Sequence, residues 1–375
     1  MEAAPATELP TGAEWQYEPK WDGFRCLVFR DGKSVHLISK SGKPLSRYFP
    51  ELITAFSALK PQRFVLDGEI VLPIEGALSF DHLLMRIHPS IGRITKLSQQ
   101  TPCIFLIFDL LVDEKGKSLV KLCLQERRNQ LEKFASKYLK TNSVLRLSPI
   151  TQKIGVARKW FHMGIALDGV IAKRRDLPYQ SGERTGMVKI KWQRTADCVV
   201  GGFRYLEKRR VVGSLLLGLY NRAGLLDHVG FTSAIQSKDR PALTKKLQQL
   251  IKPPGFTGKA PGGSSRWSTK RSSEWQPLAP RLVVEVQFDH FTGGRFRHGT
   301  KLLRWRPDKD PKDCTITQVK RESCSALDLL DKNLSPTRTG MTILKRMIAA
   351  PTTKMGTGLP TPQNAPINTA RKLLR

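Results

Sequence analysis

Hydrophobic and polar positions alternate along the first part of the chain in patterns that predict short strands and helices. Residues 26–39 hold two apolar runs around an Asp-Gly pair, which is typical of a β-hairpin. A helix is expected to begin at Pro50, because the apolar residues after it fall on one helical face, and 122–139 has the same spacing. Four further runs are rich in β-forming residues and predict strands: 64–73, 103–112, 170–174 and 188–192.

A different pattern begins near residue 195. Three strand-like runs at short spacing are followed by a helical segment and two more strand-like runs: 198–205, 214–221, 225–232, 238–251, 282–291 and 302–305. Three strands, a helix and two strands are the element order of the OB-fold, a small, partly open β-barrel that binds nucleic acid. From Lys320 onward the regular spacing is lost, and we expect disorder there apart from one short helix over Met341–Ala349.

These patterns predict an α+β protein with two domains and a tail. A mixed domain of short strands and helices occupies 1–194, and an OB-fold β-barrel domain occupies 195–319. A basic C-terminal tail, which we expect to be disordered, occupies 320–375. The chain of 375 residues is long enough for each domain to bury a core of its own.

The charge of the chain points to a polyanionic partner. Lys and Arg number 63 against 32 Asp and Glu, which gives a formal net charge of +31. A surplus of this size repels itself in the compact state, so nucleic acid is the leading candidate for a partner. An anionic membrane surface is the weaker candidate, because no basic amphipathic helix is found. The tail holds ten Lys and Arg against three Asp and Glu, so most of the surplus belongs to the two predicted domains.

The location expected from the sequence is the cytoplasm, with the protein associated with the nucleoid. No run of eighteen apolar residues is present, and the first residues lack the basic and apolar regions of a secretory signal. We therefore expect no membrane contact. Six cysteines are scattered along the chain without metal-ligand spacing, and we interpret them as reduced packing residues.

The octapeptide EPKWDGFR at 18–25 is the first candidate for chemistry. Two interpretations are open for its lysine: Lys20 is either a solvated residue ahead of an Asp-Gly turn or a nucleophile. A lysine attacks only as the free amine, so the site of such a lysine has to lower its pKa by desolvation or by nearby positive charge. Lysines at 173, 189 and 191 would supply that charge if they converge on one cleft.

At this point a family resemblance becomes specific. KWDGFR at 20–25 resembles the KxDGxR motif of the covalent nucleotidyltransferases, which comprise DNA ligases, RNA ligases and mRNA capping enzymes. Five stretches resemble the later motifs of that superfamily in the right order: LDGEIV around Glu69, LIFDLL with Phe108, DGVIAK at 168–173, MVKIKW at 187–192 and RPDK at 306–309. SKSGKPLSRYFPE at 39–51 adds a resemblance to the bacterial ATP-dependent DNA ligases of the C type.

The resemblance implies both a fold and a reaction. It implies a nucleotidyltransferase (adenylation) domain of antiparallel sheets with helices, followed by the OB-fold domain. It also implies an ATP-dependent DNA ligase that seals nicks in double-stranded DNA, in repair or end joining, with ATP and Mg²⁺ (or Mn²⁺) as cofactors. Lys20 would take AMP from ATP, the 5′-phosphate of the nick would receive it, and the 3′-hydroxyl would displace it. Each step is an in-line displacement at phosphorus, so positioning and charge neutralisation supply most of the rate.

The resemblance also implies a role for each motif residue. Glu69 and Asp168 would serve Mg²⁺ and the ribose, because Mg²⁺ prefers hard oxygen ligands. Phe108 would stack on the adenine, and Glu18 would help to set the base. Five basic residues would hold the phosphates: Arg25, Lys173, Arg184, Lys189 and Lys191. Arg306 and Lys309 would orient the pyrophosphate when the OB domain closes.

Each role has a structural alternative. Phe108 lies in an apolar run and could be a core residue, while Glu69 could be a solvated loop acid. Lys189 and Lys191 share one side of a strand by its period of two, and could simply form an exposed face. RPDK at 306–309 could be an ordinary turn.

The sequence departs from the family pattern at two positions. Asp168 stands where the family has Glu, and Lys40 stands where it has Arg, which removes a bidentate phosphate contact. Reduced activity is therefore one possible outcome. An RNA ligase or capping-type enzyme, and a non-catalytic basic OB-containing DNA-binding protein, remain as alternatives. We expect a monomer, and the sequence leaves open whether a Ku-like end-binding protein is a partner.

Overall fold

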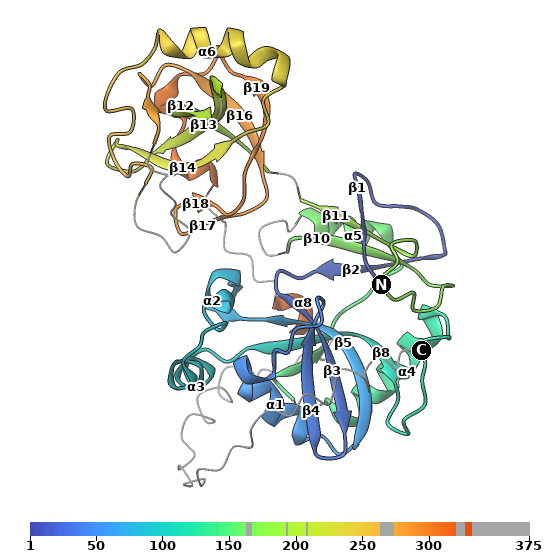
Figure 1. Ribbon diagram of the computed structural model, residues 1–375. Coiled ribbons are helices and arrows are strands. Elements are labelled where there is room, and N and C mark those ends of the chain that lie inside the picture. The colour runs from blue at the N-terminus through green and yellow to red at the C-terminus, as the bar shows by residue number, and fades with distance from the viewer. Residues whose placement is uncertain are drawn as a thin grey trace. The chain divides into compact units, whose positions relative to one another are not determined.

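A computed structural model describes residues 1–140, 142–162, 167–192, 194–207, 209–262, 274–319 and 327–331. The chain divides into two compact units (Figure 1). The first consists of Met1–Lys191 together with the segment after Ser323, of which 327–331 is described, and the second consists of Trp192–Glu322. The division at 191/192 lies a few residues before the one expected from the sequence.

The first unit contains a five-stranded sheet in the order β4-β3-β5-β8-β9. Its strands are β3 (Phe24–Asp31), β4 (Ser34–Ser39), β5 (Arg63–Val71), β8 (Ile104–Val112) and β9 (Leu145–Leu147). Neighbouring strands are antiparallel except β8 and β9, which are parallel. The hairpin predicted over 26–39 is confirmed, and its turn is made by Gly32 with φ of +60°.

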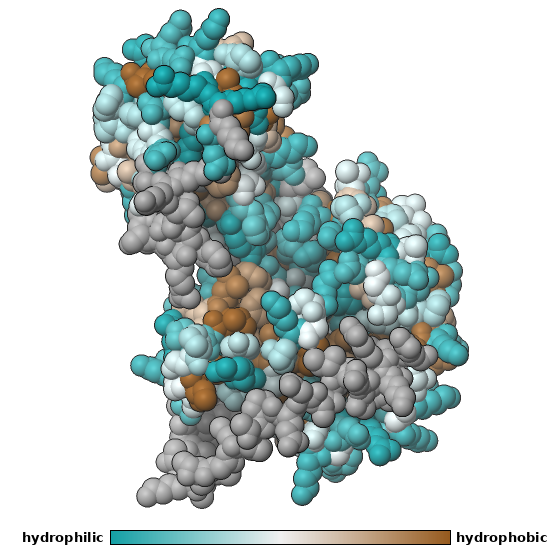
Figure 2. Space-filling view, in the orientation of Figure 1, coloured by the Kyte–Doolittle hydropathy of each residue, from teal (hydrophilic) through white to brown (hydrophobic). Residues whose placement is uncertain are grey.

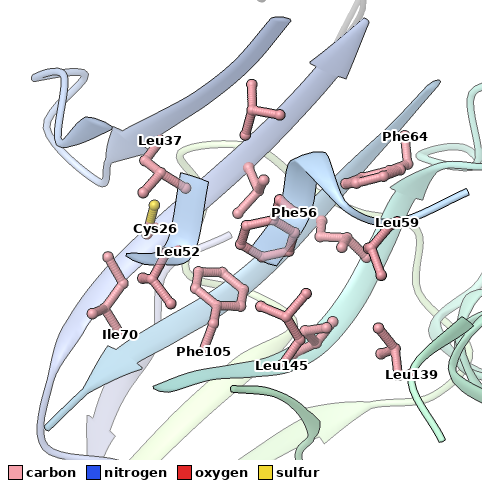
Figure 3. Packing of buried hydrophobic residues seen from close by; sticks show 14 of the residues in the cluster. Cys26, Leu37, Leu52, Phe56, Leu59, Phe64, Ile70, Phe105, Leu139 and Leu145 are labelled. Carbon is pink, nitrogen blue, oxygen red and sulfur yellow. The ribbon is translucent and has the colours of Figure 1, made fainter. Parts of the chain in front are cut away.

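The core of this sheet lies on the face covered by helix α1 (Pro50–Ser57). Figure 3 shows Leu52 and Phe56 of α1 directed toward side chains from β3, β4, β5 and β8. The rings of Phe56 and Phe105 meet edge to face, with centroids 5.2 Å apart. The helix predicted to begin at Pro50 is confirmed, as is the one predicted over 122–139, which forms α4 (Leu124–Tyr138).

The sequence did not predict the helices α2 (Phe80–Leu84), α3 (Ile91–Gln100) and α5 (Ile154–His162) of this unit. α2 and α3 each begin at a serine whose side chain accepts a backbone N–H of the first turn, which satisfies a donor that the helix itself leaves unpaired. A small hairpin of β6 (Pro73–Ile74) and β7 (Ala77–Leu78) precedes α2.

A second, four-stranded sheet has the order β1-β11-β10-β2 and carries Lys20, together with Glu18, Lys173, Lys189 and Lys191. Its strands are β1 (Ala4–Ala6), β2 (Trp15–Lys20), β10 (Gly169–Arg174) and β11 (Met187–Lys191). β1 runs parallel to β11, and the other neighbours are antiparallel. One hydrophobic cluster joins Tyr17, Val170 and Ile190 of this sheet to Trp160 of α5.

A segment beyond the second unit completes that cluster. Asp328–Asp331 form the short helix α8, and Leu330 is 4% exposed within the cluster. The expectation of a tail without structure is therefore wrong for these four residues, because an apolar side chain finds a hydrophobic site on the first unit. The helix predicted over Met341–Ala349 and the rest of the tail lie outside the described residues.

The second unit is built on an antiparallel sheet in the order β14-β13-β12-β16-β19. Its strands are β12 (Arg194–Leu206), β13 (Arg209–Tyr220), β14 (Leu226–Thr232), β16 (Val283–Phe288) and β19 (Lys301–Trp305); β15 (Gln276–Pro277) also pairs with β12. Helix α6 (Arg240–Gln248) lies between β14 and β16 in the chain. Its Thr244 hydroxyl accepts the Val212 N–H of β13 at 2.9 Å.

The two end strands of this sheet meet. Thr232, at the end of β14, forms a parallel bridge with Thr300, which directly precedes β19. The Thr300 N–H donates to the Phe231 carbonyl at 3.1 Å, and the Thr232 hydroxyl donates to the Thr300 carbonyl at 2.9 Å. A hairpin of β17 (Phe291–Thr292) and β18 (Arg295–Phe296) lies between β16 and β19 in the chain.

The described surface is largely hydrophilic on the face that Figure 2 shows. Among the large apolar side chains that stay exposed, Leu84, Met85, Ile87 and Ile91 come from the α2–α3 region. Within the described ranges, every helix is too short or too polar to cross a membrane. Five cysteines are described as free thiols, and four of these are buried, as the interpretation of packing residues requires.

Candidate active site

Lys20 lies at the last position of β2, where the strand turns into β3. Trp21 is 5% exposed, and its indole N–H donates to the Ser148 hydroxyl at 2.9 Å, which anchors the turn. A Cβ on Gly23 would lie 2.2 Å from the Ile70 carbonyl oxygen, so only glycine allows the turn to approach β5 this closely. The turn therefore holds the backbone of Lys20 in one place.

Asp168 binds the amine of Lys20. The Lys20 Nζ forms an ion pair with Asp168 Oδ2, and the Asp168 N–H donates to the Lys20 carbonyl at 2.9 Å. Lys191 Nζ lies 3.5 Å from the same carboxylate oxygen. Gly169, with φ of +135°, faces Lys20 on β2 and Lys191 on β11. Two lysines thus share one carboxylate that is 7% exposed.

A second ion pair lies further along the same strands. Lys173 Nζ is 2.7 Å from Glu18 Oε2, and Gln16 donates to the other oxygen of Glu18 at 2.9 Å. Both charged side chains are buried. Lys173 Nζ also lies 4.3 Å from the centroid of the Phe108 ring, a cation–π contact. Phe108 is only half-buried, so part of its ring is accessible beside this cation.

Arg25 is held by a buried carboxylate on the neighbouring strand. Its Nη2 and Nε lie 2.7 and 3.2 Å from the two oxygens of Asp67, and its Cζ lies 5.7 Å from the Phe108 centroid. The Tyr179 hydroxyl donates to Asp67 at 2.9 Å. Burial acts to raise the pKa of Asp67, but Arg25 and the hydrogen bond from Tyr179 outweigh it and hold that pKa below its usual range.

Glu69, two residues further along β5, differs from Asp67 in its hydrogen-bond partners and in the direction of its pKa shift. It pairs with Arg25 in the strand register, but its carboxyl makes no hydrogen bond or ion pair with the residues that the structure describes. Burial raises the pKa of Glu69 to about 8, and the charges of Lys20 and Arg25 offset this only in part. The protein thus presents a carboxyl group whose ionised form a further cation would stabilise.

A group of basic residues surrounds Lys189. Burial, followed by the positive charges of Lys20, Lys191, Lys40 and Arg184, lowers the pKa of Lys189. Glu2 lies between two of these residues, with its carboxylate oxygens 3.1 Å from Lys40 Nζ and 3.1 Å from Arg184 Nη2. The structure therefore brings Arg184 and Lys189 to the same side of the unit as Lys20.

Arg306 and Lys309 belong to the second unit and are described within it. Arg306 Nη1 lies 2.9 Å from Asp197, and its Nη2 lies 2.8 Å from Asp308. Lys309 Nζ lies 3.6 Å from Asp313. Both cations are thus held by carboxylates of their own unit.

Three residues of this site were missed from the sequence. Asp67, Gln16 and Tyr179 complete the hydrogen bonding of Arg25 and Glu18. The period of two along LDGEIV could have placed Asp67 on the same side of the strand as Glu69. Tyr179 lies in the irregular segment between β10 and β11, and we find no sequence signal for its role.

Comparison with known proteins assigns both units to one family. Residues 4–191 match the family described as "ATP dependent DNA ligase domain", and residues 208–309 match the "ATP dependent DNA ligase C terminal region". The chain belongs to the ATP-dependent DNA ligases. This ligase is 42% identical over 333 residues to DNA ligase C2 of Mycolicibacterium smegmatis, which covers 83% of this chain and 91% of the relative.

Two further comparisons bear on the ligase. It is 39% identical over 341 residues to DNA ligase C of Mycobacterium tuberculosis, covering 86% of this chain and 93% of the relative. A solved structure titled "Pmar-Lig_PreS3" shares its fold, with a TM-score of 0.54 and 17% sequence identity over 78% of this chain and 63% of the other. The resemblance to bacterial ATP-dependent DNA ligases is confirmed, and the protein is an ATP-dependent DNA ligase and hence an enzyme that acts on DNA.

Proposed function

We propose that Lys20 is the nucleophile of the ligase and carries AMP as a phosphoramidate between the two half-reactions. The observation that carries the proposal is the position of Lys20 at the end of β2, with its amine on Asp168 and with Lys189 and Lys191 nearby. A solvated lysine ahead of a turn would have no such surroundings.

The first step forms one bond and breaks one. Lys20 Nζ attacks the α-phosphorus of ATP, the new N–P bond forms, and pyrophosphate leaves with the electrons of the broken P–O bond. Before it attacks, the ammonium has to lose a proton, and Asp168 is the carboxylate in contact with it. The 5′-phosphate at the nick then takes AMP from Lys20, and the 3′-hydroxyl displaces AMP to close the strand.

The remaining residues of the first unit are assigned to binding ATP. Phe108 offers its half-exposed ring to the adenine, and Glu18 lies beside it through their shared contact with Lys173. Arg25, Lys173, Arg184, Lys189 and Lys191 would neutralise the phosphates. Asp67 keeps Arg25 charged and oriented for that role.

Glu69 and Asp168 would hold the metal ion, Mg²⁺ or Mn²⁺. Their fit rests on the chemistry of Glu69, a carboxyl with a raised pKa and no partner among the described residues, which a divalent cation would bring into its ionised form. Bound there, the ion would neutralise charge on the phosphates. Asp168, whose carboxylate pairs with Lys20, offers a second hard oxygen ligand.

For the second unit we propose an OB-fold that corresponds to residues 195–319, with the adenylation domain over 1–194 and a basic tail over 320–375. The strand order of the sheet and the parallel bridge from Thr232 to Thr300, through which the end strands meet, support a small closed barrel. Arg306 and Lys309 would orient the pyrophosphate leaving group.

We further propose that the natural substrate is nicked double-stranded DNA formed during repair or end joining. Support comes from a relative described as the "Multifunctional non-homologous end joining DNA repair protein LigD" of Mycobacterium tuberculosis, 33% identical over 312 residues, 80% of this chain and 37% of the relative. A Ku-like end-binding partner, a monomeric state and a nucleoid-associated location in the cytoplasm belong to the same proposal.

The test is transfer of label from [α-³²P]ATP to the protein in the presence of Mg²⁺. We expect the wild-type chain to become labelled and Lys20→Ala to lose the label, whereas Lys60→Ala, at an exposed lysine of the same unit, keeps it. Label on Lys20→Ala equal to wild type would refute the assignment of the nucleophile. Labelling from GTP in place of ATP would favour the capping-type alternative.

A further inference from the structure

Two ion pairs with buried carboxylates lie side by side in the first unit. Asp67 on β5 and Asp109 on β8 are partners in the strand register, and each is neutralised by an arginine. Arg25 binds Asp67, and Arg127 binds both oxygens of Asp109 at 2.9 Å with its guanidinium fully buried. Only Arg25 belongs to the proposed ATP site.

Tyr179 bridges these two pairs. Its hydroxyl donates to Asp67 Oδ2 at 2.9 Å, and its ring lies 5.6 Å from the Cζ of Arg127. Its own backbone N–H donates to the Val120 carbonyl at 2.9 Å, which fixes the residue between α4 and the sheet. Tyr179 thus contacts the Arg25–Asp67 pair through its hydroxyl and Arg127, of the other pair, through its ring.

The direction of Arg25 depends on this arrangement. Asp67 Oδ2 accepts both the Arg25 Nη2 at 2.7 Å and the Tyr179 hydroxyl at 2.9 Å, and Arg25 Nη2 also donates to the Tyr179 hydroxyl at 3.4 Å. The fork of Arg25 contacts both oxygens of Asp67, so carboxylate and guanidinium could move together as one pair, whereas a second donor at a fixed position limits that movement. Because Asp67 is completely buried, water does not replace a lost donor without cost.

We propose that Tyr179 is a positioning residue for adenylation, acting through Asp67 to aim the Arg25 guanidinium at the phosphates. The inference rests on the proposed function, in which Arg25 binds ATP. The Tyr179 hydroxyl matters for the transition state, where direction counts, more than for ground-state binding, where the charge of Arg25 suffices.

Single-turnover adenylation by the full chain tests this with Tyr179→Phe, which keeps the ring on Arg127 and removes only the hydroxyl. We expect the maximum rate constant to fall about tenfold, the effect of one lost hydrogen bond to a charged group, and the half-saturating ATP concentration to stay within about twofold. Tyr138→Phe, at a half-buried tyrosine of α4, is the matched control and should leave both values unchanged.

A double-mutant cycle separates positioning from a general structural role. With Arg25→Lys in place the fork of the guanidinium is gone, so adding Tyr179→Phe should lower the rate by less than about twofold. A full tenfold loss in that background, or a Tyr179→Phe rate equal to wild type, would overturn the inference. Failure of the wild-type chain to form lysyl-AMP would instead refute the proposed function, so the two outcomes are distinct.

Discussion

Two acidic residues of one strand show how strongly local partners decide the state of a carboxyl group. Asp67 and Glu69 both lie on β5 beside Arg25, but only Asp67 has hydrogen bonds from Arg25 and Tyr179. The pKa of Asp67 is held low, whereas burial raises the pKa of Glu69 to about 8. The low pKa of Asp67 favours the anion that orients Arg25, whereas the raised pKa of Glu69 favours the neutral acid until a cation binds nearby.

The state of Glu69 predicts a pH dependence of stability. The pKa of Glu69 in the folded protein lies above its ordinary value of 4.5, so the folded form binds the proton more tightly and this contribution to stability is full below about pH 4.5. That contribution is lost as the pH rises toward about 8. We expect Glu69→Gln to be more stable than wild type at pH 8 by at least about 3 °C in Tm without divalent ions, the rough equivalent of 1 kcal/mol.

Thermal unfolding of both proteins at pH 5 and pH 8, with and without Mg²⁺, measures this effect. The difference in Tm between wild type and Glu69→Gln should close at pH 5, where Glu69 is protonated in the folded state. Mg²⁺ at pH 8 should raise the Tm of wild type more than that of Glu69→Gln. Equal responses of the two proteins to Mg²⁺ would contradict a metal site at Glu69.

At the scale of elements, the pairing of β2, β10 and β11 brings Lys20, Asp168 and Lys191 together. This pairing depends on Gly169, which has φ of +135° and where a Cβ would lie 2.0 Å from the Ile190 carbonyl oxygen. Any side chain at this position has to push β10 away from β11. The position of Asp168 beside Lys20 is thus a property of how three strands meet.

Gly169→Ala tests this dependence. We expect it to lower the free energy of unfolding by about 2 kcal/mol, because alanine is strained at this φ and meets backbone atoms that cannot move aside cheaply. Gly155→Ala in α5 is the control, since its Cβ would meet no atom within 4 Å, and it should be neutral or stabilising. Denaturant unfolding compares the variants; equal stability of the two would mean that the strands adjust freely.

Some of the helices and strands could be predicted from the sequence, and others could not. Runs with clear periodicity, such as 26–39 and 122–139, became the elements expected of them. β1 was missed because three residues with a central proline carry no strand signal, and its pairing with β11 depends on tertiary contact. α2 was missed because five residues are too few to show a helical period.

The residues of the candidate site likewise fall into those that the sequence identified and those that it did not. Lys20, Glu69 and Phe108 could be picked out because the order of short motifs is visible in the sequence itself. Their contacts could not: the period of two could place Asp67 beside Glu69, but Asp67 and Tyr179 lie 112 residues apart in the chain, and nothing local in either segment specifies that they meet. Motif residues were found by type and order, whereas the residues that hold them in place are set by packing.

At the scale of the whole molecule, positive charge dominates. The formal net charge is +31, and the ten basic and three acidic residues from Lys320 onward account for only a minor share of it. The compact units themselves are therefore strongly basic, which suits a protein that acts on DNA. Figure 2 shows hydrophilic residues over most of the visible face.

This charge predicts a steep dependence of DNA affinity on salt. Between 50 and 200 mM salt we expect the affinity for a nicked duplex to fall on the order of 100-fold, because bound basic side chains release counterions from a handful of phosphates. Fluorescence anisotropy over a salt series measures the slope. A chain shortened after Asp331 should keep most of it; a flat response in that chain would place DNA binding in the removed segment.

The chain leaves the first unit at Lys191, builds the second, and returns so that α8 can lay Leu330 against Tyr17 and Trp160. The second unit is thus inserted in the sequence of the first and is covalently joined to it at both ends. A single proteolytic cut in either connection would not release it. During synthesis on the ribosome, the hydrophobic site that receives Leu330 stays open until the whole second unit has emerged.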